Sequence, residues 1–145
     1  MEKGLTSLAD LDSEARALVA RLSPKHVGAT LVTLSGELGA GKTTFTQAVA
    51  KAYGVKDSVT SPTFVLQKVY DLPEGSGFGH LIHIDAYRLE NGEELSALGW
   101  NALMDDASNL ILLEWPENVA DALPHADVAI ALSVATDSAR TISYA

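Results

Sequence analysis

The stretch GELGAGKTTF, residues 36–45, matches the phosphate-binding pattern G-x-x-x-x-G-K-[ST] without deviation. The apolar, β-branched segment ATLVTLS (29–35) precedes it and predicts a strand that is buried on both faces. The segment KTTFTQAVAKAYG (42–54) follows it and predicts a helix that ends at its glycine. Because a glycine-rich turn between a buried strand and a helix is the context in which this pattern binds phosphates, the sequence predicts a nucleoside-triphosphate site.

Each residue type in this turn has its own task in binding a triphosphate. Gly39, Ala40 and Gly41 let the backbone curl, so that successive N–H groups point at phosphate oxygens where a helix begins. Lys42 adds a positive charge for the terminal phosphates, and the hydroxyl of Thr43 can ligate Mg²⁺. The residues expected to bind ATP or ADP here are Gly36, Glu37, Leu38, Gly39, Ala40, Gly41, Lys42, Thr43 and Thr44.

Two acidic residues qualify as the carboxylates that such a loop needs near Mg²⁺. Glu114 ends the apolar run LILLE, and Asp85 lies in HIDAYR, where strand alternation predicts that it shares a face with His83 and Tyr87. We expect water to attack the γ-phosphate in line, with one acid orienting the water and the other binding the metal; the sequence leaves their roles interchangeable. The alternatives are a solvated strand end for Glu114 and a salt bridge with Arg88 for Asp85.

The segment SPTF, residues 61–64, lies between the predicted helix and the next strand. Nucleotide switches often place a hydroxyl there that senses the γ-phosphate or its metal. Pro62 would hold this segment extended and present Thr63, which is therefore an expected catalytic residue together with Lys42. The alternative is an ordinary Ser-Pro turn.

The remaining pattern predicts a single α/β domain over residues 1–145. Ser13 is expected to cap an N-terminal helix over 14–22. The segments 63–72 and 80–89 predict an antiparallel hairpin, 109–115 a buried strand, and the last twenty residues an antiparallel pair. The fold class that follows is a three-layer sandwich like that of P-loop NTPases, with a mixed parallel and antiparallel sheet.

The composition of the chain argues against some classes of binding partner and against insertion into a membrane. The chain has 145 residues, no Cys and a formal net charge of −9. An acidic chain is a poor candidate for binding nucleic acid alone, because that binding draws on cations that meet phosphates. The longest apolar run, VAIALSVA (128–135), is too short to span a bilayer, and the N-terminus lacks the apolar core of a secretory signal. A soluble cytoplasmic protein is expected, with its oligomeric state left open.

Four motifs taken together, GELGAGKTT, SPTF, HIDAYRL and LLEWPENV, resemble in sequence and order the TsaE (YjeE) family of small bacterial P-loop ATPases. The phosphate loop is shared by many families, whereas H-x-D-x-Y-R and E-W-P make the resemblance specific. It implies a role in forming N6-threonylcarbamoyladenosine at position 37 of certain tRNAs. The ATPase would join TsaB and TsaD, the latter carrying out the transfer, and would contact tRNA only through that complex. ATP binding would favour assembly, and slow hydrolysis would reset the complex.

The resemblance also implies roles for individual residues. Lys42 would contact the phosphates, Thr43 would bind Mg²⁺, and Glu114 would occupy the position of the Walker B acid. Asp85 and Thr63 match the family's other functional polar sites. Two further matches belong to the nucleotide site: Trp115, beside the acid, and Arg140, in SARTIS near the end of the chain.

Proteins with other functions contain the same phosphate-binding loop. A small-molecule or nucleotide kinase would usually carry an arginine-bearing lid, but this chain has only four arginines, at 16, 21, 88 and 140. A GTPase would need a guanine-reading N-K-x-D element, which the sequence lacks. A binding module that never hydrolyses its nucleotide stays open.

Overall fold

The computed structural model describes residues 2–37, 39–56 and 67–144, which form one seven-stranded sheet with helices on both faces. The strands are β1 (Glu2–Leu5), β2 (Thr30–Ser35), β3 (Gln67–Asp71), β4 (His80–Asp85), β5 (Asn109–Glu114), β6 (Val128–Thr136) and β7 (Ala139–Tyr144). The helices are α1 (Leu8–Arg21), α2 (Lys42–Ala52), α3 (Glu93–Ser96), α4 (Trp100–Met104) and the 3₁₀-helix η1 (Pro116–Ala122).

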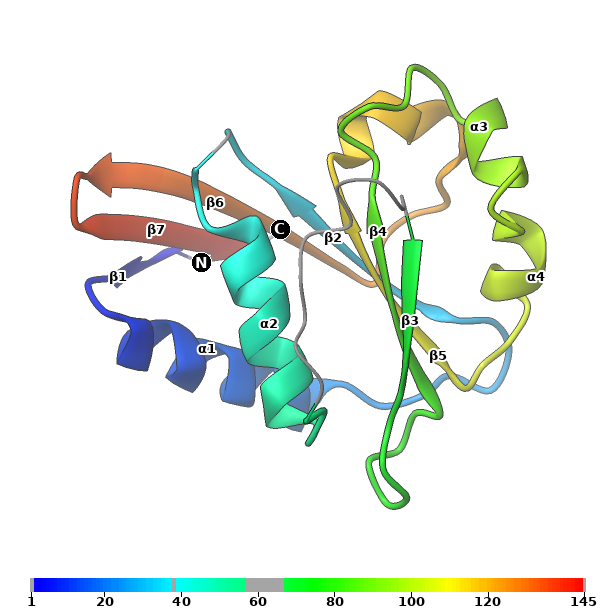
Figure 1. Cartoon of the computed structure of the whole chain (residues 1–145), viewed down its shortest axis with the longest axis horizontal. Coiled ribbons are helices and arrows are strands. Elements are labelled where there is room, and N and C mark those ends of the chain that lie inside the picture. The colour runs from blue at the N-terminus through cyan, green and yellow to red at the C-terminus, as the bar shows by residue number, and fades with distance from the viewer. Residues whose placement is uncertain (1, 38, 57–66, 145) are drawn as a thin grey trace.

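The sheet is mixed, with strand order β1-β7-β6-β2-β5-β4-β3. Its centre is parallel, because β2 pairs with β5 and β6, and β5 pairs with β4, all in the same direction. The outer strands β3, β7 and β1 run antiparallel to their neighbours (Figure 1). Strands β2 and β5, in the middle of the sheet, are buried along almost their whole length, as a parallel sheet covered on both faces requires. The predicted mixed α/β sheet is confirmed.

Alternation along the strands divides the core into two layers. On one face Val32 and Leu112 pack with the buried residues of α1 and α2. On the other face Leu31, Ile111 and Leu113 pack with α3, α4 and η1. Figure 1 shows α1 and α2 side by side, well away from α3 and α4. The predicted three-layer sandwich is therefore confirmed.

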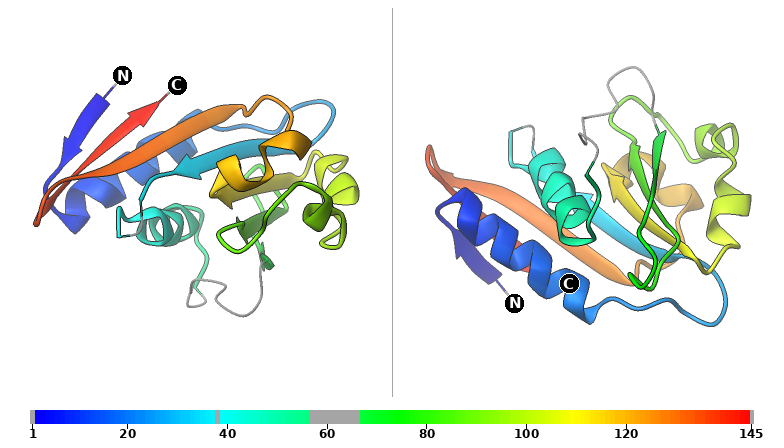
Figure 2. Two further views of the ribbon diagram at one scale, coloured as in Figure 1. Left: turned by 90° about the horizontal axis from the view of Figure 1, so that it is seen from above. Right: turned by 60° about the horizontal axis from the view of Figure 1, so that its bottom comes forward.

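The N-terminal region differs from its prediction. Helix α1 begins at Leu8 and is capped by Ser7, whose hydroxyl accepts a hydrogen bond from the Asp10 N–H at 3.1 Å, so the predicted cap at Ser13 is wrong. A serine at either position fits the capping rule, and only the path of the chain before the helix selects one. The unpredicted strand β1 pairs with β7, which brings the two termini together (Figure 2).

The β3–β4 hairpin is confirmed, but β4 stops at Asp85. The chain turns there, because the Ala86 N–H donates to the carbonyl of Glu114 and the Leu89 N–H to that of Ala86. Tyr87 consequently lies beyond the strand and is 48% exposed, so the expectation that alternation places it with Asp85 and His83 is wrong. None of the helices in the described part of the chain is both long and apolar enough to cross a membrane.

Candidate functional site

The glycine-rich turn joins β2 to α2 in backbone conformations that favour glycine. Gly36 has a φ of +147°, and a Cβ there would lie 2.3 Å from the carbonyl oxygen of Leu132 in β6. Gly41, the residue before α2, has a φ of +102° in the left-handed region. These two glycines let the chain leave the sheet close to β6 and enter α2 at once, as an anion-binding loop requires.

Lys42 is held across this turn. Its ammonium donates hydrogen bonds to the carbonyl oxygens of Gly36 and, at 3.0 Å, of Glu37, and it lies 4.3 Å from the centroid of the Trp115 ring. The side chain is buried, and burial lowers the pKa of Lys42, while the carboxylates of Glu114 and Asp85 oppose this shift. The predicted lysine therefore lies over the loop in contact with the predicted tryptophan.

The two predicted acids meet at the carboxyl ends of neighbouring parallel strands. Asp85 ends β4 and Glu114 ends β5, and the two residues lie opposite each other in register. The Thr43 hydroxyl, in the first turn of α2, lies 3.4 Å from Oε1 and 3.3 Å from Oε2 of Glu114. Ligands of open α/β sheets bind at this edge, beyond the carboxyl ends of the strands. The structure therefore brings Lys42, Thr43, Asp85 and Glu114 together as the sequence predicted.

Asp85 and Glu114 have different surroundings. Glu114 is 2% exposed, whereas Asp85 is half-buried and its Oδ1 accepts a hydrogen bond of 3.0 Å from the Tyr87 N–H. Burial raises the pKa of Asp85, and the negative charge of Glu114 adds to this shift, while the Tyr87 N–H opposes it. The alternative considered for Asp85, a salt bridge with Arg88, is not among the ion pairs of the described residues.

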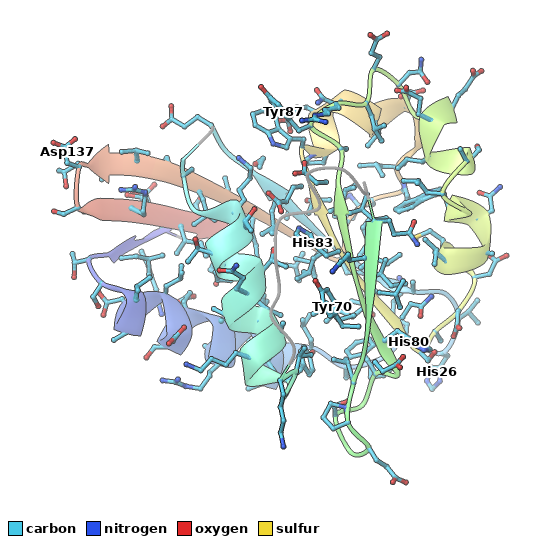
Figure 3. All side chains as sticks on the ribbon, viewed as in Figure 1. His26, Tyr70, His80, His83, Tyr87 and Asp137 are labelled. Carbon is cyan, nitrogen blue, oxygen red and sulfur yellow. The ribbon has the colours of Figure 1, made fainter. Side chains whose placement is uncertain are left out.

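His83 is a member of the site that the sequence predicted only to share a face with Asp85, with no role of its own. The imidazole is fully buried on β4, and its Nε2 contacts Oε2 of Glu114. Figure 3 shows it in the middle of the sheet, away from His26 and His80 at the other end of β4. The signal available in the sequence was its position two residues before Asp85, which places both side chains on one face of a strand.

Trp115 connects the acid to the loop. Its backbone has a φ of 60° and a ψ of 52°, a left-handed conformation that is rare for a bulky residue. Its N–H donates to the carbonyl of Leu34 at the end of β2, and its ring packs against Tyr87 with 5.1 Å between centroids. Asn118, another residue missed from sequence, donates from Nδ2 to the carbonyls of Ala86 and Tyr87. The segment after β5 therefore stabilises the turn after β4 through these contacts.

Arg140 lies on the other side of the loop. Its Nε donates to the carbonyl of Gly39 at 3.3 Å, and its Nη1 donates to the carbonyls of Thr136 and Ala139. The arginine therefore lies beside the loop, and its expected place near a nucleotide stays a prediction. Beside it is an open pocket of about 380 Å³, between the loop, the start of α1 and the β6–β7 turn that carries Asp137 (Figure 3). The pocket is lined by Leu5, Ser7, Leu8, Leu11, Gly39, Ala40, Gly41, Thr44, Asp137, Ser138 and Arg140.

Thr63 and Leu38 lie outside the described residues, so their expected roles stay predictions. Among the residues that the structure describes, no group of three or more His, Asp or Glu side chains is arranged to hold a metal by itself. Thr43, Asp85 and Glu114 instead offer one hydroxyl and two carboxylates at one edge of the sheet. This set fits Mg²⁺, which takes one or two protein carboxylates and fills its other positions with water and phosphate oxygens.

Comparison with known proteins identifies the family. The family model described as threonylcarbamoyl adenosine biosynthesis protein TsaE matches residues 5–142. The chain belongs to the TsaE family. It is 41% identical over 109 residues to a tRNA threonylcarbamoyladenosine biosynthesis protein TsaE of Streptomyces coelicolor, covering 74% of this chain and 71% of that TsaE protein. A TsaE protein of Treponema pallidum is 37% identical over 116 residues, or 80% of this chain and 82% of its own length.

A solved structure supports the same assignment. The crystal structure of Bacillus subtilis YdiB superimposes on this chain with a TM-score of 0.78 and 27% identity, covering 99% of this chain and 83% of YdiB. The fold and the family of this chain therefore agree with the resemblance that its four motifs predicted.

Proposed function

We propose that this chain is the ATPase subunit for formation of threonylcarbamoyladenosine on tRNA, binding ATP with Mg²⁺ and hydrolysing it slowly. The observation that carries the proposal is the meeting of three groups where α2 begins: the Lys42 ammonium over the loop, the Thr43 hydroxyl and the Glu114 carboxylate. A lysine, a hydroxyl and an acid in this arrangement are what triphosphate chemistry requires. The names of the curated relatives supply the pathway.

Each group has a task in the proposed reaction. The amides of the loop and Lys42 bind the β- and γ-phosphates and neutralise charge on the transferring group. Thr43 and Glu114 would hold Mg²⁺, which when bound supplies further positive charge to the phosphate oxygens. Asp85 faces the same space and would orient the attacking water, or exchange this role with Glu114. A bond then forms from the water oxygen to the γ-phosphorus, the bond to the bridging oxygen breaks, and ADP and phosphate leave.

The pocket beside Arg140 is where the base and ribose would lie. It opens directly next to the loop, and its walls combine the apolar side chains of Leu5, Leu8 and Leu11 with polar groups at the β6–β7 turn. A volume of about 380 Å³ falls within the usual range for small-ligand sites.

Slow hydrolysis by the isolated chain follows from its shortage of cations. Lys42 and Arg140 are the cationic side chains that contact the loop carbonyls among the described residues, and Arg140 lies on the pocket side, away from the acids. Fast phosphoryl transfer normally uses an additional arginine near the transferring phosphate. We propose that the nucleotide instead regulates a partner, the TsaB–TsaD complex in the cytoplasm, and that hydrolysis resets this complex between turnovers.

The test is to change Glu114→Gln and to measure ATP affinity by calorimetry and turnover by phosphate release. Binding of ATP in EDTA is expected to be retained and hydrolysis in Mg²⁺ to be lost, because the loop and Lys42 still hold the phosphates. Unchanged turnover would contradict the role of Glu114, and absence of heat on titrating Mg²⁺ and ATP into the parent protein would overturn the whole proposal.

The regulatory part needs its own experiment. Capture of a purified TsaB–TsaD complex by this chain is compared in the presence of ATP and of ADP. Stronger capture with ATP is expected. Equal capture in both nucleotide states would contradict a nucleotide switch while leaving the ATPase itself intact.

A further inference from the structure

The side chain of Glu114 turns back along the sheet toward a buried histidine. In the parallel register of β4 and β5, Asp85 lies opposite Glu114, whereas His83 lies opposite Leu112, two residues earlier. The carboxylate nevertheless contacts Nε2 of His83, and both side chains are almost fully buried, at 0% and 3% exposure. Glu114 is therefore held inward, diagonally across two strands, by a partner that the strand register alone does not select.

The imidazole of His83 makes this contact through one of its two ring nitrogens, Nε2. An ionised carboxylate can only accept, so His83 donates to it from Nε2. The other ring nitrogen, Nδ1, is buried and has no hydrogen-bond partner among the residues that the structure describes. A histidine that served only to tie core elements together would be expected to use both ring nitrogens. Within the described part of the chain this ring has one hydrogen-bond partner, the acid of the candidate site.

The Thr43 hydroxyl cannot replace His83 as the group that orients Glu114. It lies 3.4 Å and 3.3 Å from the two carboxylate oxygens, so it is shared between them at long range and does not fix their rotation. In the proposed function it is also a ligand for Mg²⁺. Among the described residues His83 is therefore the close partner that can hold the Glu114 carboxylate while Thr43 binds the metal.

We propose that His83 is a positioning residue: it fixes the rotation of the Glu114 carboxylate, so that Oε2 stays on the imidazole and Oε1 is presented to Mg²⁺ beside Thr43. This inference rests on the proposed function. Groups that orient a metal-binding side chain in this way change metal affinity or activity by about 10- to 100-fold when they are removed. His83 would act through its contact with Glu114.

A pair of isosteric substitutions separates orientation from space filling. His83→Gln places an amide N–H₂ near the position of Nε2, whereas His83→Asn places it near that of Nδ1, too short to reach Glu114. The readout is the ratio of the ATP dissociation constants without and with Mg²⁺, together with the Mg²⁺ concentration that gives half-maximal turnover. We expect His83→Gln to stay within about threefold of the parent and His83→Asn to need about 10- to 100-fold more Mg²⁺.

Binding of ATP in EDTA is the internal control, because the loop and Lys42 do not depend on His83. It is expected to change less than about twofold in both variants, which also confirms that they are folded. Equal Mg²⁺ dependence of the Gln and Asn variants would overturn the proposal, since a space-filling role does not distinguish the two ends of an amide.

Should the Asn variant not fold, the Glu114→Gln background provides the second test. His83→Leu, which fills the space but cannot donate a hydrogen bond, is made in the parent and in the Glu114→Gln variant, and the Mg²⁺ effect on ATP affinity is measured in both. If His83 acts through Glu114, His83→Leu adds nothing in the Glu114→Gln variant, and independent, additive losses would overturn the proposal. A parent protein that shows no Mg²⁺-dependent ATP binding would instead refute the proposed function, so the two failures are distinguishable.

Discussion

The two faces of β4 and β5 differ although they are built from the same twelve residues. On the face toward α3, α4 and η1, His80 and Asn109 begin the strands, and the side chains that follow are Ile82, Ile84, Ile111 and Leu113, all in one apolar cluster. On the face toward α2, the strands begin with Leu81, Leu110 and Leu112, and the positions toward the carboxyl ends are His83, Asp85 and Glu114. Polar and apolar side chains alternate where the site begins.

This difference indicates how the fold supports a buried polar site. Burying an acid is costly unless donors or cations accompany it, and here they come from α2 and from the neighbouring strand. On the opposite face, Asn109 at the start of β5 donates a hydrogen bond to the Leu103 carbonyl of α4, and the positions beyond it stabilise the sheet by apolar burial. One face therefore stabilises the strands while the other holds the polar groups of the site, and substitutions on each should have separable effects.

The largest expected effect tests this separation directly. Leu113→Ala and Leu112→Ala truncate adjacent, fully buried leucines on opposite faces of β5. Each is expected to lower the free energy of unfolding by about 2–5 kcal/mol, measured by urea denaturation. Only Leu112→Ala should also change the turnover of the folded protein, because Leu112 lies opposite His83 in register. An equal change in turnover from Leu113→Ala would show that the two faces are not separable.

The next effect concerns binding. Lys42→Ala removes a charged donor at the loop and is expected to weaken ATP binding by about 100-fold or more, since hydrogen bonds to charged groups are each worth about 1.5–3 kcal/mol. Lys51→Ala is the matched control, because it makes the same charge change at the far end of α2, where the side chain is 78% exposed. Calorimetry measures both, and a similar loss from both variants would assign the effect to net charge instead of to the loop.

A smaller loss of ATP affinity is expected from a change in the pocket beside Arg140. Arg140→Ala removes the hydrogen bond to the Gly39 carbonyl and a wall of the pocket, and should weaken ATP binding by about 3- to 10-fold, or roughly 1 kcal/mol. Arg16→Ala changes the net charge equally on the exposed surface of α1, where its guanidinium contacts Ser13. Nucleotide titrations of both variants should show a loss for Arg140→Ala alone; unchanged binding in that variant would remove the pocket from the site.

The smallest effect has the opposite sign. Because burial raises the pKa of Asp85 above its ordinary value of 3.8, the folded chain holds this proton more tightly than the unfolded chain does. The stability that protonated Asp85 contributes is present below that ordinary value and is lost as the pH rises through the raised pKa. Asp85→Asn keeps a neutral side chain at every pH, so the nucleotide-free variant should be slightly more stable than the parent at pH 7.

Thermal melting across pH measures this difference. It should shrink toward zero in acid, where the parent's Asp85 is also neutral, while ATP turnover is lost at pH 7. A variant less stable than the parent at neutral pH would show that ionised Asp85 stabilises the nucleotide-free fold, and would contradict the expectation drawn from its burial.

The sequence predicted the parts of the site that follow from local pattern. The spacing of Gly36, Gly41 and Lys42 between a buried strand and a helix is typical of a phosphate-binding loop, so this loop could be predicted from the sequence. Glu114 could be predicted because an acid at the end of an apolar run is costly to bury unless a cation or hydrogen-bond donors accompany it. Local pattern could not distinguish Ser7 from Ser13 as a cap, because both precede helical sequence and either can accept a backbone hydrogen bond.

The missed residues depend on contacts between distant segments. Asn118 is joined to Ala86 and Tyr87 across about thirty residues of sequence, and the carboxylate of Glu114 rotates toward His83 on a neighbouring strand. No spacing rule relates these positions, because the pairing of β4 with β5 is decided by the packing of the whole sheet.

The sequence by itself determined a phosphate-binding turn, an apolar parallel centre and the acids that end its strands, because each of these rests on the chemistry and period of consecutive residues. Only the tertiary structure decided that Arg140 and the β6–β7 turn meet the start of α1 beside the loop, and that His83 meets Glu114. The reason is that side-chain contacts across strands depend on register and rotation, which are fixed by the packed core as a whole and not by any single segment.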